Sequence, residues 1–301
     1  MEAVTETSLP LKMFQRGKVR DVYDLGQELL IVSTDRISAF DVVLPTGVPG
    51  KGRVLNQMSA FWFQATSGII DNHMVESIDS AESLARLGVR LSLREALPDY
   101  LVGRSMVVKK AERIPVECVI RGYLSGSAWA EYRTRGTVQG HQMPEGLMES
   151  EQLAAPLFTP TTKSETEHDR PLTNKDVEEL HLKETMPALE RASLSVYAYA
   201  AAYARERGII IADTKFEFGW LEGKLILIDE ALTPDSSRFW SVQGYAAGRS
   251  QPSYDKQPVR DWLAASGWKD HLPVPPLPPN VIAETTERYG AVFRRLAEAA
   301  A

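Results

Sequence analysis

The stretch Ile209–Trp240, IIIADTKFEFGWLEGKLILIDEALTPDSSRFW, decides how the rest of the chain is interpreted. Its first four residues are apolar and mostly β-branched, which is typical of a buried strand. Charged and apolar residues then alternate, so Asp213, Lys215 and Glu217 share one face of that strand. A turn and a second apolar run follow. The pattern predicts a β-hairpin with charged side chains on a buried framework.

The carboxylates of this hairpin need partners, because a buried and unpaired charge is costly. A magnesium ion with phosphate ligands would satisfy them. A turn of three or five residues around Gly223 would place Asp229 opposite Glu217, and a two-residue turn would not. The alternative is a hairpin edge whose charges face water. The segment 235–238, DSSR, offers hydroxyls and a guanidinium that suit an anion.

Composition limits the class of protein. The 301 residues are 44% hydrophobic and 25% charged, as in globular proteins that form one large or two modest domains. The net charge of −6 and the scattered basic residues argue against a nucleic-acid surface. The single cysteine, Cys118, excludes an intrachain disulfide and is interpreted as a buried hydrophobic residue. With no apolar stretch of the roughly 20 residues that span a bilayer, we expect no membrane contact and a cytoplasmic location.

The N-terminal region has the pattern of a hairpin that could cover phosphates. A strand at 12–15, a basic loop containing Gly17 and a strand at 28–33 follow one another. Gly17 allows close backbone approach, and Lys18 and Arg20 supply positive charge. The loop matches neither GxxxxGK[ST] nor GxGxxG, so a plain turn is the alternative.

Other segments have simpler interpretations. Strands are expected at 105–110 and 116–121, and helices at 54–67, 128–134, 258–265 and 281–300. The loop 45–52 is either a solvent turn or a ligand wall, and Ser127 is either a helix cap or an anion contact. Residues 135–171 show no regular pattern and are expected to form a long polar loop. A capping box at Thr173 and Asp176 begins helical structure that extends to Arg207.

Four segments together resemble one known family. They are IADTKFEFG (211–219), IPVECVIRGYLSGS (114–127), GKVRDVY (17–23) and DE…PDSSRFW (229–240), and they closely resemble segments of the SAICAR synthetases of purine biosynthesis. The resemblance runs from about residue 16 to 260. Ser125 departs from the Thr or Ala expected there. The insert at 135–155 resembles the longer members of the family and leaves the oligomeric state open.

The resemblance implies an ATP-dependent ligase. ATP, L-aspartate and carboxyaminoimidazole ribonucleotide (CAIR) would give the succinocarboxamide SAICAR, ADP and phosphate. Forming an amide from a carboxylate in water requires activation, here as a carboxyl phosphate that the aspartate amine attacks. The protein must hold several polyanions together, so basic residues and magnesium are expected.

The resemblance also implies roles for individual residues. The nucleotide site would consist of Gly17, Lys18, Arg20, Lys109 and Glu117, and the magnesium ligands would be Glu217 and Asp229. CAIR would be held by Asp41, Arg121, Ser127, Ser237 and Arg238. The catalytic side chains beside the transferred phosphoryl group would be Lys215, Asp213 and Lys163.

The fold implied is α+β with two lobes. A small β-rich domain at 1–110 would cover ATP, and a larger α/β domain at 111–301 would hold the second substrate and magnesium. The cleft between them would close over a water-sensitive intermediate. We expect a monomer, with a homodimer as the alternative.

Two other functions fit parts of the sequence. A small-molecule kinase would share the hairpin and the acidic strand but needs a base beside a substrate hydroxyl. A nucleotide sensor without turnover would have no use for Lys215, Glu217, Asp229 and Arg238 together.

Overall fold

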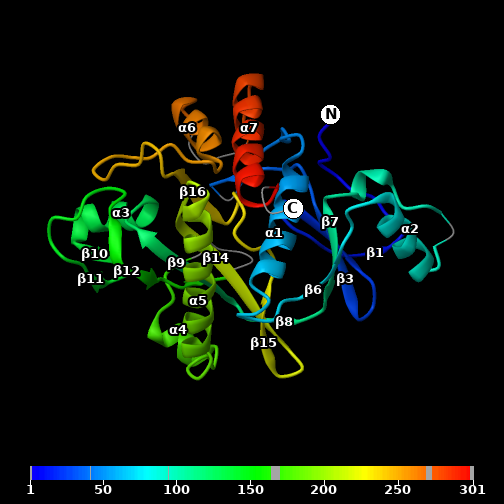
Figure 1. The fold of residues 1–301 in the computed structure, drawn as a ribbon, viewed down its shortest axis with the longest axis horizontal. Coiled ribbons are helices and arrows are strands. Elements are labelled where there is room, and N and C mark those ends of the chain that lie inside the picture. The colour runs from blue at the N-terminus through cyan, green and yellow to red at the C-terminus, as the bar shows by residue number, and fades with distance from the viewer. Residues whose placement is uncertain (1, 41, 94, 164–169, 269–272, 299–301) are drawn as a thin grey trace.

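The computed structural model describes residues 2–40, 42–93, 95–163, 170–268 and 273–298. Two antiparallel sheets and the helices around them form an α+β fold (Figure 1). The helical elements are α1 (Lys51–Ala65), α2 (Ala81–Arg90), η1 (Asp99–Leu101), α3 (Gly126–Arg135), α4 (Asn174–Glu179), α5 (Met186–Glu206), α6 (Gln257–Ala265) and α7 (Pro279–Leu296).

The N-terminal sheet contains the hairpin expected around Gly17. Its strands run in the order β1 (Lys12–Arg16), β2 (Arg20–Asp24), β3 (Glu28–Ser33), β7 (Ser105–Lys109) and β6 (Met74–Ser77). Strand β1 is exposed along its whole length, whereas the ELLIVS run of β3 becomes buried toward its end. The sheet therefore has β1 as an open edge and β3 in its core, with the basic loop between β1 and β2.

The second sheet is built around β14 (Ile209–Leu221), the strand predicted from the charged hairpin. Its neighbours are β8 (Glu112–Arg113), β9 (Val116–Tyr123), β15 (Lys224–Ile228) and β16 (Ser237–Ser241), with β12 (Gln152–Phe158) and β13 (Thr161–Thr162) on the far side of β9. Because β14 pairs with four strands, side chains from several parts of the chain meet on it. Short pairs complete the strands: β4 (Ser38–Ala39) with β5 (Val42–Val43), and β10 (Thr137–Val138) with β11 (His141–Gln142).

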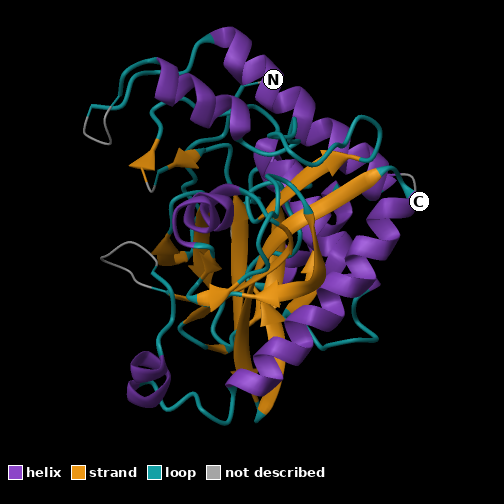
Figure 2. Cartoon of the chain, turned by 90° about the vertical axis from the view of Figure 1, so that its left-hand side faces the viewer, coloured by secondary structure: helices purple, strands orange, loops and turns teal. Residues whose placement is uncertain are grey.

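Helices lie on more than one side of the strands, as Figure 2 shows. Helix α5 packs on β14 and β9, and α1 packs on β3, β6, β7 and α7. One hydrophobic core joins Trp62 and Phe63 of α1 to Phe216 and Phe218 of β14. The core thus continues across residue 110, and the division into two domains there remains a prediction.

The prediction of a long polar loop at residues 135–171 is wrong. In place of a long loop, this region contains β10, β11, β12 and β13. Strand β12 has only Leu153 fully buried, so it lacks the alternation that marks a strand, and pairing with β9 stabilises it instead. The helical run to Arg207 comes in two pieces, α4 and α5, and Pro187 lies in the first turn of α5.

Candidate functional site

The turn of the charged hairpin has two residues. Leu221 pairs with Lys224, and the intervening Glu222 and Gly223 both have positive φ, as a tight hairpin turn requires. Glu217 therefore pairs with Ile228, and Asp229 is not opposite Glu217. The sequence left open whether the turn places Asp229 opposite Glu217, and the two-residue turn shows that it does not.

Asp229 nevertheless lies close to the charged face. Its φ of 70° is left-handed and turns the chain just after β15 ends. Its carboxylate accepts a hydrogen bond of 2.7 Å from Arg20, whose guanidinium also lies 3.6 Å from Glu230. Burial and the negative charge of Glu217 raise the pKa of Asp229 above its ordinary value, although Arg20 opposes this.

A cluster of two lysines and two glutamates occupies the middle of β14. The Nζ atoms of Lys163 and Lys215 each lie 2.6 Å from Oε1 of Glu217. They also lie 2.9 Å and 3.0 Å from Oε1 of Glu117 on β9. Burial raises the pKa of Glu217, but the positive charges of Lys215 and Lys163 have the larger opposite effect. The pKa of Glu217 is therefore well below the usual range. Burial likewise opposes the charge of Lys215, and the glutamates raise its pKa. Glu217 and Lys215 are therefore expected to be ionised.

An arginine-lined pocket of about 170 Å³ adjoins this cluster. Asp213 forms an ion pair with Arg238 and lies 3.6 Å from Arg121, which donates a hydrogen bond of 3.3 Å to Ser127. Burial and the neighbouring Arg238 lower the pKa of Arg121, whereas Asp213 raises the pKa of Arg238. The lining residues are Val119, Arg121, Ser127, Asp213, Thr214, Lys215, Pro234, Asp235, Ser236, Ser237, Arg238, Asp255 and Arg260. With its three arginines and its serine hydroxyls, the pocket can accept an anion such as a phosphate.

Gly126 is required for this arrangement. It has a φ of 57°, and a Cβ atom there would lie 2.5 Å from a guanidinium nitrogen of Arg238. Any side chain at this position would displace Arg238. Ser237 is fixed by a 2.8 Å hydrogen bond with the hydroxyl of Thr214 on β14.

Sequence reasoning missed a buried pair that supports the pocket. Lys51, at the start of α1, forms a 2.7 Å ion pair with Asp235. The hydroxyl of Tyr289 on α7 donates a 2.6 Å hydrogen bond to the same carboxylate. Lys51 stood out in the sequence only as a basic residue in the loop 45–52, and nothing local identified its partner. Lys51 is entirely buried, and no residue of the loop 45–52 is among those that line the pocket.

Some predicted residues lie apart from these clusters. Lys109 is exposed at the end of β7, and no described contact connects it to Glu117 or Lys215. Gly17 and Lys18 form the basic loop, and Arg20, the first residue of β2, pairs with Asp229. Asp41 is outside the described residues.

The acidic residues fit a magnesium ion only in company with other ligands. In the part of the chain that the structure describes, no group of three or more His, Cys, Asp or Glu side chains could hold a metal ion by itself. Repulsion between Asp229 and Glu217 shows in the raised pKa of Asp229, and a cation would relieve it. Because magnesium usually takes one or two carboxylates plus phosphate and water oxygens, Glu217 and Asp229 suit a phosphate-bound ion.

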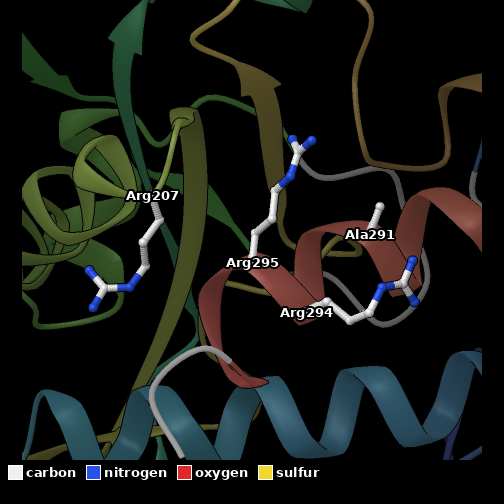
Figure 3. Close-up of a pocket in the computed structure, with 4 residues that line it drawn as sticks. All are labelled: Arg207, Ala291, Arg294 and Arg295. Carbon is white, nitrogen blue, oxygen red and sulfur yellow. The ribbon is translucent and has the colours of Figure 1, made fainter.

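A second hollow is lined by Arg207, Ala291, Arg294 and Arg295. Its arginine side chains project in different directions and do not converge on one point (Figure 3). The residues that line this hollow include no carboxylate and none of the predicted site residues. Among the described helices, none is long and apolar enough to cross a membrane.

The fold and the charged pocket define an enzyme that acts on phosphorylated substrates. The family model described as SAICAR synthetase matches residues 13–275. A phosphoribosylaminoimidazole-succinocarboxamide synthase of Thermodesulfovibrio yellowstonii is 50% identical over 297 residues, covering 97% of this chain and 98% of that protein. The chain belongs to the SAICAR synthetase family.

Solved structures agree in fold. The SAICAR synthase from Saccharomyces cerevisiae, solved in complex with SAICAR, has a TM-score of 0.85 and 40% identity, with 98% of each chain covered. A type-2 SAICAR synthetase in complex with ADP has a TM-score of 0.68 and 20% identity, covering 94% of this chain and 97% of that one. The predicted α+β SAICAR-synthase-like fold is confirmed.

Proposed function

We propose that the protein joins L-aspartate to CAIR, with hydrolysis of ATP to ADP and phosphate, to form SAICAR. The observation that carries this proposal is the sharing of one strand face by two sites. Asp213, at the arginine pocket, and Glu217, in the lysine cluster, are four residues apart on β14, a separation of about 13 Å. Lys215 lies between them and belongs to both sites.

The arginine pocket would bind the phosphate and sugar of CAIR. Arg121, Ser127, Ser237 and Arg238 supply donors, and Asp213 fixes the arginines. Asp41 is proposed for the imidazole side. The yeast relative solved with SAICAR supports a phosphorylated ribonucleotide as the ligand of this family.

The lysine cluster would neutralise charge during transfer of the phosphoryl group to the CAIR carboxylate. Lys215 and Lys163 are charged and partly exposed, so their ammonium groups can reach substrate oxygens. Preorganised cations of this kind stabilise the charge that develops in a transition state. Magnesium, when bound by Glu217 and Asp229, would supply further positive charge for the phosphate oxygens.

The N-terminal sheet would cover the nucleotide. Gly17 and Lys18 belong to the loop between β1 and β2, Arg20 begins β2, and Glu117 lies on β9 in the lysine cluster. Lys109 is retained as a contact on the nucleotide side. The ADP-bound relative supports a nucleotide in this fold. We also propose that residues 1–110 form a small domain and that the protein is a monomer.

The test is ADP release with magnesium and ATP, with CAIR and L-aspartate supplied singly and together. We expect release that requires both, with SAICAR formed in equal amount. Release with one substrate and no amide product would indicate a kinase. ATP binding without release in any combination would indicate a sensor.

A further inference from the structure

The basic loop between β1 and β2 is hydrogen-bonded to a second segment, residues 34–36. The carbonyl oxygens of Gly17 and Lys18 accept hydrogen bonds of 2.9 Å and 3.1 Å from the guanidinium of Arg36. The next carbonyl, of Val19, accepts bonds of 3.0 Å and 2.7 Å from the amide and hydroxyl of Thr34. Three successive loop carbonyls are thus bound by residues 34–36.

Arg36 is itself fixed on its other side. Its Nη2 atom lies 2.8 Å from the fully buried carboxylate of Asp21, and its Nη1 atom donates a 2.7 Å bond to the carbonyl of Thr5. The side chain is only 11% exposed. The planar guanidinium therefore links two loop carbonyls to a buried anchor, which a flexible side chain could not do as well.

Holding the carbonyls also orients the loop amides. In a planar trans peptide, the N–H of one residue points opposite to the carbonyl of the residue before it. With the carbonyls of residues 17–19 turned toward Arg36 and Thr34, the amides of residues 18–20 are turned away from them. Successive backbone N–H groups of this kind bind anions such as phosphates.

We propose that Arg36 is a positioning residue for the nucleotide: it holds the loop at Gly17 and Lys18 so that its amides face the phosphates. The inference rests on the proposed function in that the loop is taken to bind ATP. The new element is that the affinity for the nucleotide depends on the side chain of Arg36, which does not contact the nucleotide. A purely structural role would instead affect both substrates or only stability.

The test compares Arg36→Lys with Arg16→Lys. Lysine at position 36 keeps the charge beside Asp21, but its single nitrogen has three N–H donors and cannot bond the four acceptors that the guanidinium reaches. Arg16 is the matched control, because its Nε atom also pairs with Asp21, at 3.3 Å, while it has no described bond to the carbonyls of residues 17–19. Calorimetric titration with MgADP gives the dissociation constant, and steady-state kinetics give KM for ATP, CAIR and L-aspartate.

For Arg36→Lys we expect the MgADP dissociation constant and the KM for ATP to rise about tenfold, as for the loss of one or two hydrogen bonds. The KM values for CAIR and L-aspartate should stay within about twofold of the wild type, and Arg16→Lys should leave all four constants within the same limit. If Arg36→Lys does not fold, Thr34→Val removes a single hydroxyl and should raise the MgADP constant about threefold.

An unchanged MgADP constant in a folded Arg36→Lys protein would overturn the inference. An equal rise in the KM for CAIR would also overturn it, because that would indicate general loosening. The titration needs no turnover, so weaker MgADP binding in a chain that forms no SAICAR would support the inference while refuting the proposed function.

Discussion

Glu117 and Glu217, on neighbouring strands β9 and β14, are bridged by the same two lysines. Lys163 and Lys215 each lie within 3.0 Å of both carboxylates. Two positive and two negative charges therefore neutralise each other at the centre of the site. A magnesium ion that binds Glu217 would compete with this pairing and release ammonium groups for phosphate oxygens, which links metal binding to phosphate binding.

Glu217→Gln is expected to lose about 3 kcal/mol of transition-state stabilisation, a factor of roughly 100 or more in kcat/KM, because magnesium and both lysines lose a charged partner. Steady-state assays at limiting magnesium measure the effect. Glu222→Gln, at the exposed tip of the same hairpin, is the control and should behave as the wild type. Wild-type turnover of Glu217→Gln at limiting magnesium would contradict the assignment.

Arg238→Ala should raise the KM for CAIR at least tenfold, since a charged hydrogen-bond donor to phosphate is lost, and should change the KM for ATP much less. Gly126→Ala should have the same selectivity, because its Cβ atom would displace the Arg238 guanidinium. Kinetics with each substrate varied in turn test both variants. A KM for CAIR equal to that of the wild type in Arg238→Ala would exclude a phosphate role.

Lys51→Met should destabilise the fold by about 3–5 kcal/mol, because it leaves the buried carboxylate of Asp235 without its cation. The double variant with Asp235→Asn should lose less than the sum of the two single changes. Urea unfolding measures each free energy. Lys175→Met breaks an exposed pair with Glu179 and should cost below about 1 kcal/mol. Additive losses would show that Lys51 and Asp235 are not coupled.

Cys118 should be inert in the native state. Burial raises the pKa of its thiol to about 12, whereas a free cysteine has a pKa of about 8.5. Between these values only the unfolded chain loses the proton, so this group makes stability fall as pH rises above about 8.5. A thiol reagent at pH 9 should label the denatured protein at least about 100 times faster than the native one. Similar rates would show that the thiol is accessible.

The local parts of the site could be predicted from sequence. Alternation along β14 placed Asp213, Lys215 and Glu217 on one face, because the period of two is a property of the strand itself. The DSSR pattern indicated Arg238 as an anion contact, and resemblance to the family added Lys163; the fold brings both to that strand.

Long-range relationships could not be predicted in the same way. Lys51 and Asp235 are 184 positions apart, and only the packed fold brings them together. Strand β12 depends on pairing with β9 rather than on its own pattern. The left-handed backbone of Asp229 has no local signal, since glycine is the residue that usually marks such a conformation.

In the proposed reaction, phosphoryl transfer beside Lys215 activates the CAIR carboxylate. The most direct measurement uses CAIR labelled with ¹⁸O in that carboxylate, with ATP, magnesium and L-aspartate, and analyses the phosphate released by mass spectrometry. We expect one ¹⁸O atom from the CAIR carboxylate in each phosphate that is released. Unlabelled phosphate, formed together with SAICAR, would contradict this mechanism.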